Sequence, residues 1–162
     1  MSELVNEAIE TSEDTQKGKF LTFSVGDEDY GIEIYHVTEI IGIQEITEVP
    51  GLPDYVKGII NLRGKIIPVV EVRLRFKKEA IVYDDRTCII VIDIKDITVG
   101  LIIDSVSEVL TILSENIVSP PDTRTGFQNN YVKGIGKVGN SVKLLLDCEK
   151  LLGEEELEET EK

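Results

Sequence analysis

Short runs of apolar residues, separated by turn-forming residues, fill the central part of the chain. The runs are four to eight residues long and rich in β-branched side chains: Phe20–Val25, Ile59–Leu62, Ile66–Val70, Cys88–Ile94 and Val142–Leu146. Runs of this length and composition predict strands, and the turn residues between them predict hairpins. We therefore expect a mainly β protein built as a small barrel or sandwich.

Two segments are compatible with short helices. One is Val37–Ile41, and the other is the stretch after Asp147, whose side chain is a plausible N-cap. We expect little helix beyond these two segments.

The chain repeats itself. Residues Phe20–Ile41 align without a gap on Ile89–Leu110, and Tyr55–Ile59 recurs, in the same order, as Tyr131–Ile135. The first alignment equates four pairs of residues: Asp27 with Asp96, Gly31 with Gly100, Val37 with Val106, and Glu39 with Glu108. Two matching windows in the same order indicate an internal duplication, with repeat units of about residues 19–76 and 88–152.

A duplicated unit of this size has a physical consequence. Each copy can close only a small barrel with a thin core, so the two copies must share buried surface. Two lobes side by side leave a groove, where partner segments commonly bind. We expect a link between the copies at Lys77–Thr87 and a long loop at Ser119–Asn130.

Net charge changes the list of possible partners. The chain carries −14, of which the acidic ends, residues 1–18 and 153–162, together carry −9. Such ends are typical of solvated tails, and an acidic protein would repel a phosphate backbone. The acidic N-terminus is unlike a signal peptide, and no apolar run is long enough to cross a membrane. We expect a soluble cytoplasmic protein that does not bind nucleic acid.

Candidate chemistry is sparse. His36 is the only histidine, and Cys88 and Cys148 are isolated in apolar runs, so we expect neither a metal site nor a catalytic triad. The glycines of Gly134-x-Gly136-x-x-Gly139 match a dinucleotide fingerprint in spelling but lack the strand and helix that it needs. A glycine-rich hairpin is the better interpretation, so we expect no cofactor and no enzymatic activity.

Two groups of basic residues leave alternatives open. Arg63, in the turn Asn61–Lys65, is either placed to bind a carboxylate of a partner or is an ordinary solvated arginine. A second group is concentrated at the end of an apolar run and consists of Arg73, Arg75, Lys77 and Lys78. Solvation is the favoured interpretation of this group, and a docking patch for an acidic partner is the alternative.

Three spaced blocks of the sequence resemble the CheW family of chemotaxis coupling proteins. The blocks are GIINLRGKIIPVVEVRLRF at Gly58–Phe76, FLTFSVGDEDYGIEIYHVTEI at Phe20–Ile40, and VGLIIDSVSEVL at Val99–Leu110. The resemblance extends from about Lys19 to Leu152. It implies two small five-stranded SH3-like β-barrels between which strands can be exchanged. It also implies a cytoplasmic adaptor, monomeric when free, that joins the regulatory domain of the histidine kinase CheA to the tips of transmembrane chemoreceptors in arrays.

The resemblance also implies which residues bind the receptor or the kinase. Those that match the family pattern are Val37, Glu39, Ile40, Gly58, Asn61, Leu62, Arg63, Gly64, Gly100 and Val106. We expect the apolar members to contact a receptor helix in the groove. Arg63 and Glu39 could fix its register, with each other or with the partner as their counter-ion. Glu71 and Ile41 depart from the family, which often has aspartate and arginine at these places.

Two other functions remain as alternatives. One is an adaptor for a CheA-like kinase that controls a different output. The other is a small barrel that binds oligonucleotides. Such a barrel would need basic residues and exposed aromatic rings on one face.

Overall fold

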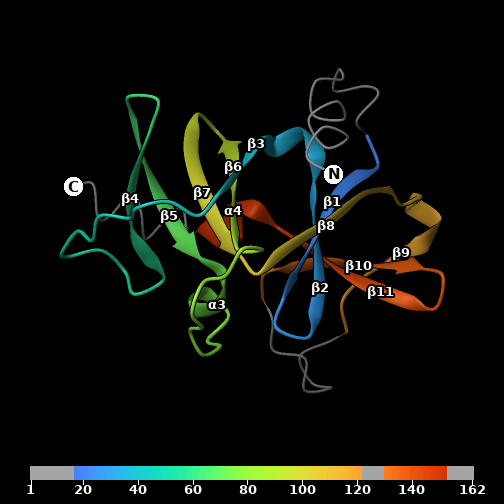
Figure 1. Cartoon of the computed structure of the whole chain (residues 1–162). Coiled ribbons are helices and arrows are strands. Elements are labelled where there is room, and N and C mark those ends of the chain that lie inside the picture. The colour runs from blue at the N-terminus through green and yellow to red at the C-terminus, as the bar shows by residue number, and fades with distance from the viewer. Residues whose placement is uncertain (1–16, 122–129, 153–162) are drawn as a thin grey trace.

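Two β-sheets form the two lobes of the protein in the computed structural model, which describes residues 17–121 and 130–152 (Figure 1). Lobe A holds a six-stranded sheet in the order β8 (Ser105–Thr111), β1 (Lys19–Val25), β2 (Glu28–Glu33), β11 (Ser141–Leu146), β10 (Val132–Val138) and β9 (Ile117–Val118). Lobe B holds a five-stranded sheet in the order β3 (Val37–Gly42), β6 (Cys88–Ile94), β7 (Ile97–Ile103), β5 (Lys65–Glu71) and β4 (Val56–Leu62). The predicted acidic ends, apart from residues 17 and 18, and most of the predicted loop Ser119–Asn130 lie outside the described residues.

The two repeats exchange their first hairpins. The hairpin β1–β2 of the first repeat lies in the sheet of the second, between β8 and β11, while β6–β7 lies between β3 and β5 of the first. The registers are equivalent, because Val37 pairs with Ile92 and Phe23 pairs with Val106. Each exchanged hairpin joins its new sheet through one parallel pairing, β2 with β11 and β7 with β5. The duplication and the exchange implied by the resemblance are thus confirmed.

The core of the protein has three parts. A joint core between the lobes contains Leu21 and Phe23 of β1 together with Ile90 and Ile92 of β6, and each of these side chains is fully buried. Smaller clusters fill the interior of each lobe, around Ile60, Ile67 and Ile89 in lobe B and around Phe20, Ile112 and Leu145 in lobe A. Alternate residues of β6 therefore face the interior of lobe B and the joint core, which explains why this strand is apolar on both faces. The expected sharing of buried surface is confirmed.

Helical structure is limited to single turns among the described residues. These are η1 (Ile34–His36), α3 (Val72–Arg75), η2 (Ser114–Asn116) and α4 (Cys148–Leu152). The helix expected after Asp147 is confirmed, and Asp147 Oδ1 accepts hydrogen bonds from the N–H groups of Glu149 and Lys150 at 3.1 and 3.3 Å. None of the described helices is long and apolar enough to span a membrane.

The prediction of a helix at Val37–Ile41 is wrong, because this segment forms most of strand β3. Its residues pair along β6, with Glu39 opposite Val91 and Ile40 opposite Ile90. Tertiary pairing therefore overrides the short apolar spacing that suggested a helix.

The glycine motif is a strand and a turn, as expected. Gly134 and Gly136 lie in β10, and Gly139, with a φ of 58°, opens the two-residue turn into β11. A Cβ on Gly136 would lie 3.0 Å from Ile112 Cδ1, so this glycine allows close packing inside lobe A.

Candidate partner-binding surface

The turn between β4 and β5 presents Arg63 in a fixed backbone conformation. Arg63 and Gly64 are the two turn residues, with φ values of 52° and 87°, as a type I′ turn requires. The side chain of Asn61 supports the turn, because its Oδ1 accepts the N–H of Gly64 at 2.8 Å. Glycine fits this conformation freely, whereas an arginine there costs about 1 kcal/mol. Lobe B therefore tolerates local strain in order to hold an arginine at its tip.

Arg63 pairs with Glu39 within the chain. Its Nη2 donates to Glu39 Oε2, and this hydrogen bond raises the pKa of the guanidinium. Glu39 lies on β3 and Arg63 follows β4, so the ion pair connects the two edge strands of the lobe B sheet. The Arg63 side chain stays 70% exposed, and such pairs contribute little to stability. The ion pair instead fixes a geometry, because Glu39 orients the exposed guanidinium of Arg63, and the other N–H groups of that guanidinium can donate to a partner.

Apolar side chains lie on the same strands as this ion pair. Ile40 follows Glu39 on β3, is half-buried, and packs against the joint core. Leu62 precedes Arg63, is half-buried, and packs against the interior of lobe B. We call Glu39, Ile40 and Asn61–Gly64 the tip surface of lobe B.

Three residues of the predicted site are packing residues in the structure. Val37 is 3% exposed and belongs to the joint core. Gly58 is buried at a β-bulge, where a Cβ would lie 2.2 Å from the carbonyl oxygen of Thr47. Gly100 is buried between β5 and β6, where a Cβ would lie 2.6 Å from Ile89 Cγ2. The expectation that Val37 offers its side chain to a receptor helix is corrected, because that side chain is enclosed by the core.

Val106 lies in the other lobe. It is half-buried on β8, opposite Phe23 of β1, and packs against the joint core. The repeat makes it the counterpart of Val37, but its greater exposure leaves part of the side chain accessible. A groove shared by Val106 and the tip surface stays a prediction.

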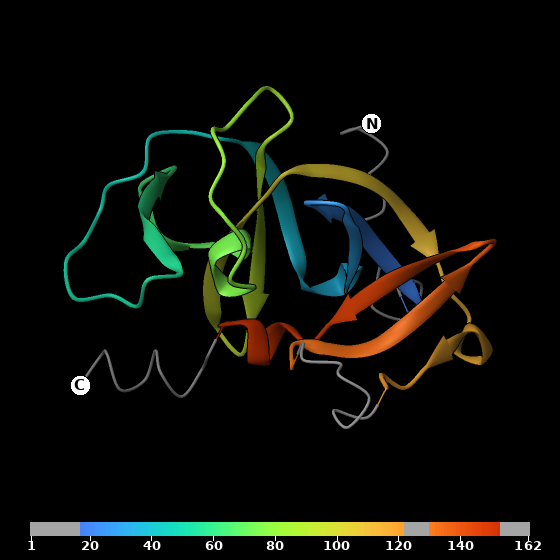
Figure 2. The same ribbon diagram turned by 90° about the horizontal axis from the view of Figure 1, so that it is seen from below.

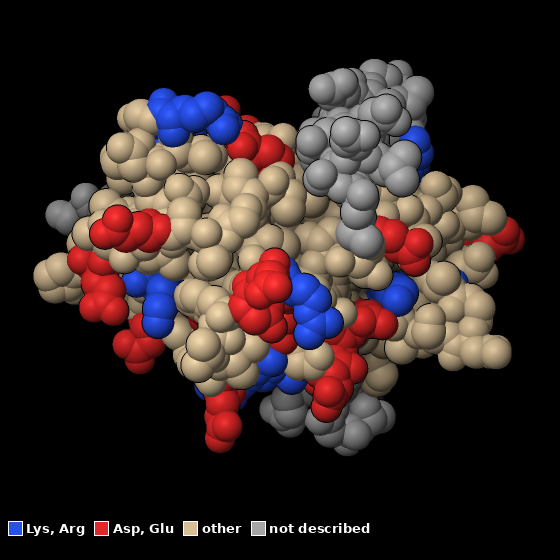
Figure 3. Space-filling view, viewed as in Figure 1, with Lys and Arg blue, Asp and Glu red and all other residues tan. Residues whose placement is uncertain are grey.

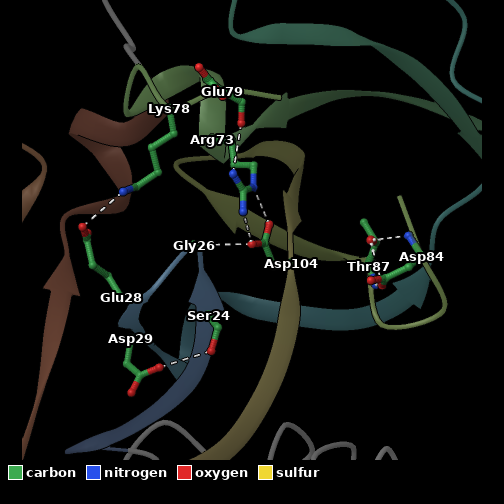
Figure 4. A network of polar contacts seen from close by, with 10 residues as sticks. All are labelled: Ser24, Gly26, Glu28, Asp29, Arg73, Lys78, Glu79, Asp84, Thr87 and Asp104. Atoms are coloured by element: carbon green, nitrogen blue, oxygen red, sulfur yellow. Dashed lines mark hydrogen bonds and ion pairs between the residues drawn. The ribbon is translucent and has the colours of Figure 1, made fainter. Parts of the chain in front are cut away.

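The group of basic residues after β5 is largely used inside the protein. Arg73 binds Asp104, and Lys78 Nζ lies 3.1 Å from Glu28 Oε1 (Figure 4). The guanidinium carbon of Arg75 lies 3.9 Å from the ring centroid of Tyr55 and 4.8 Å from that of Tyr131, the repeat-related tyrosines. A docking patch made of these arginines and Lys78 is therefore the wrong interpretation.

Among the exposed apolar residues that the sequence pattern did not reveal, two lie at equivalent places of the repeats. Ile66 on β5 is 57% exposed and Val142 on β11 is 52% exposed. The hairpins β4–β5 and β10–β11 that carry them lie at opposite ends of the molecule (Figures 1 and 2). Extending the second repeat alignment, which equates Val70 with Leu146, would have paired Ile66 with Val142 and revealed the symmetry.

Glu71, one of the two departures from the family, is buried at the end of β5. Its Oε2 accepts a hydrogen bond from the hydroxyl of Tyr83 in the segment that links the repeats. The pKa of Glu71 is raised, mainly by burial and also by the nearby charge of Asp104. The hydrogen bond from Tyr83 and the charges of Lys57 and Arg73 act in the opposite direction and offset only part of this rise. The longer side chain of glutamate thus ties the link between the repeats to lobe B.

We expect Glu71 to make stability depend on pH. The pKa of its carboxyl is higher in the folded than in the unfolded chain, where it is near 4.5. Its contribution is therefore fully present below the unfolded pKa and is lost as the pH rises through the folded pKa. Glu71→Gln, which keeps an acceptor for Tyr83, should equal the wild type in acid and exceed it at neutral pH. Urea unfolding at both pH values measures this, and an equal difference at both would contradict it.

Comparison with known proteins agrees with this geometry. Residues 19–156 match the family described as CheW-like domain. The chain is 38% identical to the chemotaxis protein CheW of Klebsiella aerogenes over 86% of its length and 84% of that protein. It is 35% identical to the chemotaxis protein CheW of Treponema pallidum, over 86% and 85% of the two chains. The crystal structure of the scaffolding protein TtCheW from Thermoanaerobacter tengcongensis superposes with a TM-score of 0.74 and 35% identity, over 80% of this chain and 88% of that one. The chain belongs to the CheW-like domain family.

Proposed function

We propose that this protein is a cytoplasmic adaptor that couples transmembrane chemoreceptors to the histidine kinase CheA in chemotaxis arrays. The named relatives are chemotaxis proteins, and the related crystal structure is of a scaffolding protein. The observation that carries the proposal is the tip surface, where a turn and the Glu39 carboxylate hold Arg63 exposed beside half-buried apolar residues. The module that performs this role is residues 19–152, and it needs no catalytic group because phosphoryl transfer belongs to the kinase.

The receptor would contact the tip surface and Val106. A helix of the receptor tip would place apolar side chains on Ile40 and Val106, and Arg63 would donate its remaining N–H groups to carboxylates or carbonyls of that helix. Because Glu39 already orients the guanidinium, little side-chain freedom is lost on binding. Individually weak contacts suffice, since an array holds many of them at once.

The kinase would contact the ends of the molecule. Ile66 and Val142 are exposed at equivalent places on hairpins that project in opposite directions. An apolar residue on a protruding hairpin is suited to barrel-to-barrel packing, in which it becomes buried. Val142 lies on the lobe that does not carry the tip surface, whereas Ile66 pairs with Asn61 beside it, so a kinase bound at the Val142 end leaves the tip surface open to the receptor.

We expect Val106→Glu to weaken receptor binding and leave the kinase contact largely intact. The change places a carboxylate against an apolar helix, at a cost of about 2–4 kcal/mol, or roughly 30- to 1000-fold in affinity. Calorimetry with a receptor-tip fragment and with the regulatory domain of the kinase measures both affinities. Val142→Glu is the matched control, because Val142 is exposed on the lobe without the tip surface, and it should show the opposite selectivity. Unchanged receptor binding together with a lost kinase contact would refute the assignment of the two surfaces.

In the described part of the chain, four aromatic rings pack against one another, whereas an oligonucleotide-binding barrel would present its rings to nucleobases. The rings of Phe23, Tyr30, Phe76 and Tyr131 lie next to one another in this order, with centroid separations of 5.9, 5.0 and 5.6 Å. Basic side chains on the face shown in Figure 3 are interspersed with acidic ones rather than forming a continuous basic track. Binding of a single-stranded nucleic acid needs exposed aromatic rings, on which the nucleobases stack, and a positively charged groove for the phosphates.

A further inference from the structure

The link between the two repeats carries the most exposed large apolar side chain of the described residues. Val82 is 92% exposed and its neighbour Ile81 is 42% exposed, whereas the next most exposed, Ile66, reaches 57%. Residues 78–84 lie outside every helix, strand and turn, and the link forms the yellow-green loop at the top of Figure 2. Two aliphatic side chains are thus presented to solvent on a protruding segment.

The backbone of this segment is as open as its side chains. Within residues 17–121 and 130–152, the N–H and carbonyl groups of residues 80–82 have no hydrogen-bond partner. A single exposed aliphatic side chain is common on protein surfaces and needs no explanation. Three consecutive exposed apolar residues with unpaired N–H and carbonyl groups have instead the properties of an edge strand, which is a template for pairing with another strand.

Both ends of the segment are fixed to the body of the protein. On the N-terminal side, Arg73 Nη1 donates to the carbonyl oxygen of Glu79 at 3.0 Å (Figure 4). On the C-terminal side, the hydroxyl of Tyr83 donates to the buried carboxylate of Glu71 at the end of β5. Because residues 80–82 are held from both sides, ordering them on binding costs little conformational entropy.

The charge around the segment indicates the kind of partner. Residues 79–85 contain three acids and no basic residue, and the acids are Glu79, Asp84 and Asp85. All three are exposed, and none forms a salt bridge with another described residue. The exposed bases Lys77 and Arg86 lie outside this stretch. The segment is therefore complementary to an edge strand whose aliphatic residues are flanked by lysine or arginine.

A second copy of this chain does not offer such a strand. In the described part of the chain, the outer strands of the two sheets are β8 and β9 in lobe A and β3 and β4 in lobe B. Strands β3 and β8 each contain a glutamate and no basic residue, and β9 is uncharged. Strand β4 contains a lysine, but Thr47 already bridges to it at Ile59. The net charge of −14 also opposes association of two copies, so the complementary partner is a different protein.

We propose that residues 80–82 are a docking strand, with which a basic edge strand of a partner protein pairs by β-augmentation. In this mode the main-chain hydrogen bonds provide affinity, and the side chains of Ile81 and Val82 provide selectivity. The site is additional to the surfaces assigned above to the receptor and the kinase. It does not depend on the proposed function, and its test uses neither of those partners, so the two can fail separately.

The test titrates the isotope-labelled full chain with the peptide acetyl-KVTVTVK-amide, an isolated strand with basic ends. The amide NMR signals of residues 79–83 should shift saturably, and the N–H groups of residues 80–82 should exchange with solvent more slowly in the complex. The same peptide with glutamate in place of both lysines should bind about tenfold more weakly. No saturable shift, or equal affinity for the two peptides, would overturn the proposal.

Two proline variants examine the main-chain pairing. Successive N–H groups of a strand point to opposite edges, so Ile81→Pro blocks one edge and Val82→Pro blocks the other. Neither N–H has a partner within the described chain, so both variants should unfold at the wild-type temperature, and one of them should lose roughly tenfold in affinity. Wild-type affinity in both variants would refute the pairing. Leu113→Ser is the matched control, since Leu113 is a 55% exposed apolar residue outside the link, and it should leave the affinity unchanged.

Two measurements on the wild type complete the test. If the proline variants fold poorly, hydrogen exchange of the free protein decides. The N–H groups of residues 80–82 should then exchange as fast as those of an unstructured peptide, and protection would overturn the proposal. Sedimentation of the protein alone examines the second copy as the partner. Self-association that Val82→Pro abolishes would assign the segment to contacts between copies and refute a basic partner protein.

Discussion

Val37→Glu should leave the protein largely unfolded at neutral pH. Val37 is 3% exposed and lies opposite Ile92, in the joint core that both lobes share. A carboxylate placed there loses its hydration without a counter-ion, at a cost of several kcal/mol. Domains of this size have a total stability of about 5–15 kcal/mol, so most of it would be removed. Urea unfolding followed by circular dichroism should show a lost or strongly shifted transition.

Val106→Glu is the internal control for this result. The repeat places Val106 at the same position of the other lobe, but its side chain is only half-buried, so its carboxylate can reach water and the fold should persist. A folded Val37→Glu protein with lost receptor affinity would restore Val37 to the binding surface and contradict its assignment to the core.

Gly58→Ala should destabilise the protein by about 3 kcal/mol. The new methyl carbon would lie 2.2 Å from the carbonyl oxygen of Thr47 and 2.8 Å from Ile46 Cγ2. Thr47 cannot move away freely, because its N–H and carbonyl both bond to Ile59 at 2.9 Å. Relief of the clash therefore breaks this bridge and opens the end of lobe B.

Gly42→Ala is the matched control for Gly58→Ala. Gly42 is exposed at the end of β3, and nothing lies within 4 Å of a Cβ built there. Its substitution should change the midpoint of chemical unfolding little. If Gly58→Ala unfolds at the same denaturant concentration as Gly42→Ala but loses a partner, Gly58 acts in binding and the packing explanation fails.

The strands, hairpins and duplication could be predicted because they rest on local patterns. Apolar runs and turn residues are visible in the sequence, and the gap-free alignment of the repeats gives equivalent positions such as Val37 and Val106. The segment Val37–Ile41 was assigned wrongly because its strand conformation depends on β6, which is distant in the sequence. Helix α3 escaped prediction because four residues are too few to show helical periodicity.

The site could be predicted only in part because residue type does not reveal depth. Val37 and Val106 are identical in sequence, yet one is enclosed and the other is half-exposed. The basic residues after β5 resembled a surface patch because Asp104, the partner of Arg73, lies elsewhere in the chain. The pairing of Arg63 with Glu39 was left open, and it required the curvature that brings β3 to β4.

The exchange of hairpins has a consequence for how the chain acquires its fold during synthesis. The hairpin β1–β2 is synthesised before its neighbours in the sheet, β8 and β11, which belong to the second repeat. The sheet of lobe B is also incomplete at this stage, because β6 and β7, which lie between β3 and β5, are synthesised after β3, β4 and β5. Neither lobe can therefore close while the first repeat alone has emerged, and pairings so distant in sequence form slowly. Until β8 and β11 have been made, the hairpin β1–β2 lacks both of its neighbours in the sheet, and a nascent chain with such open strand edges is prone to aggregate.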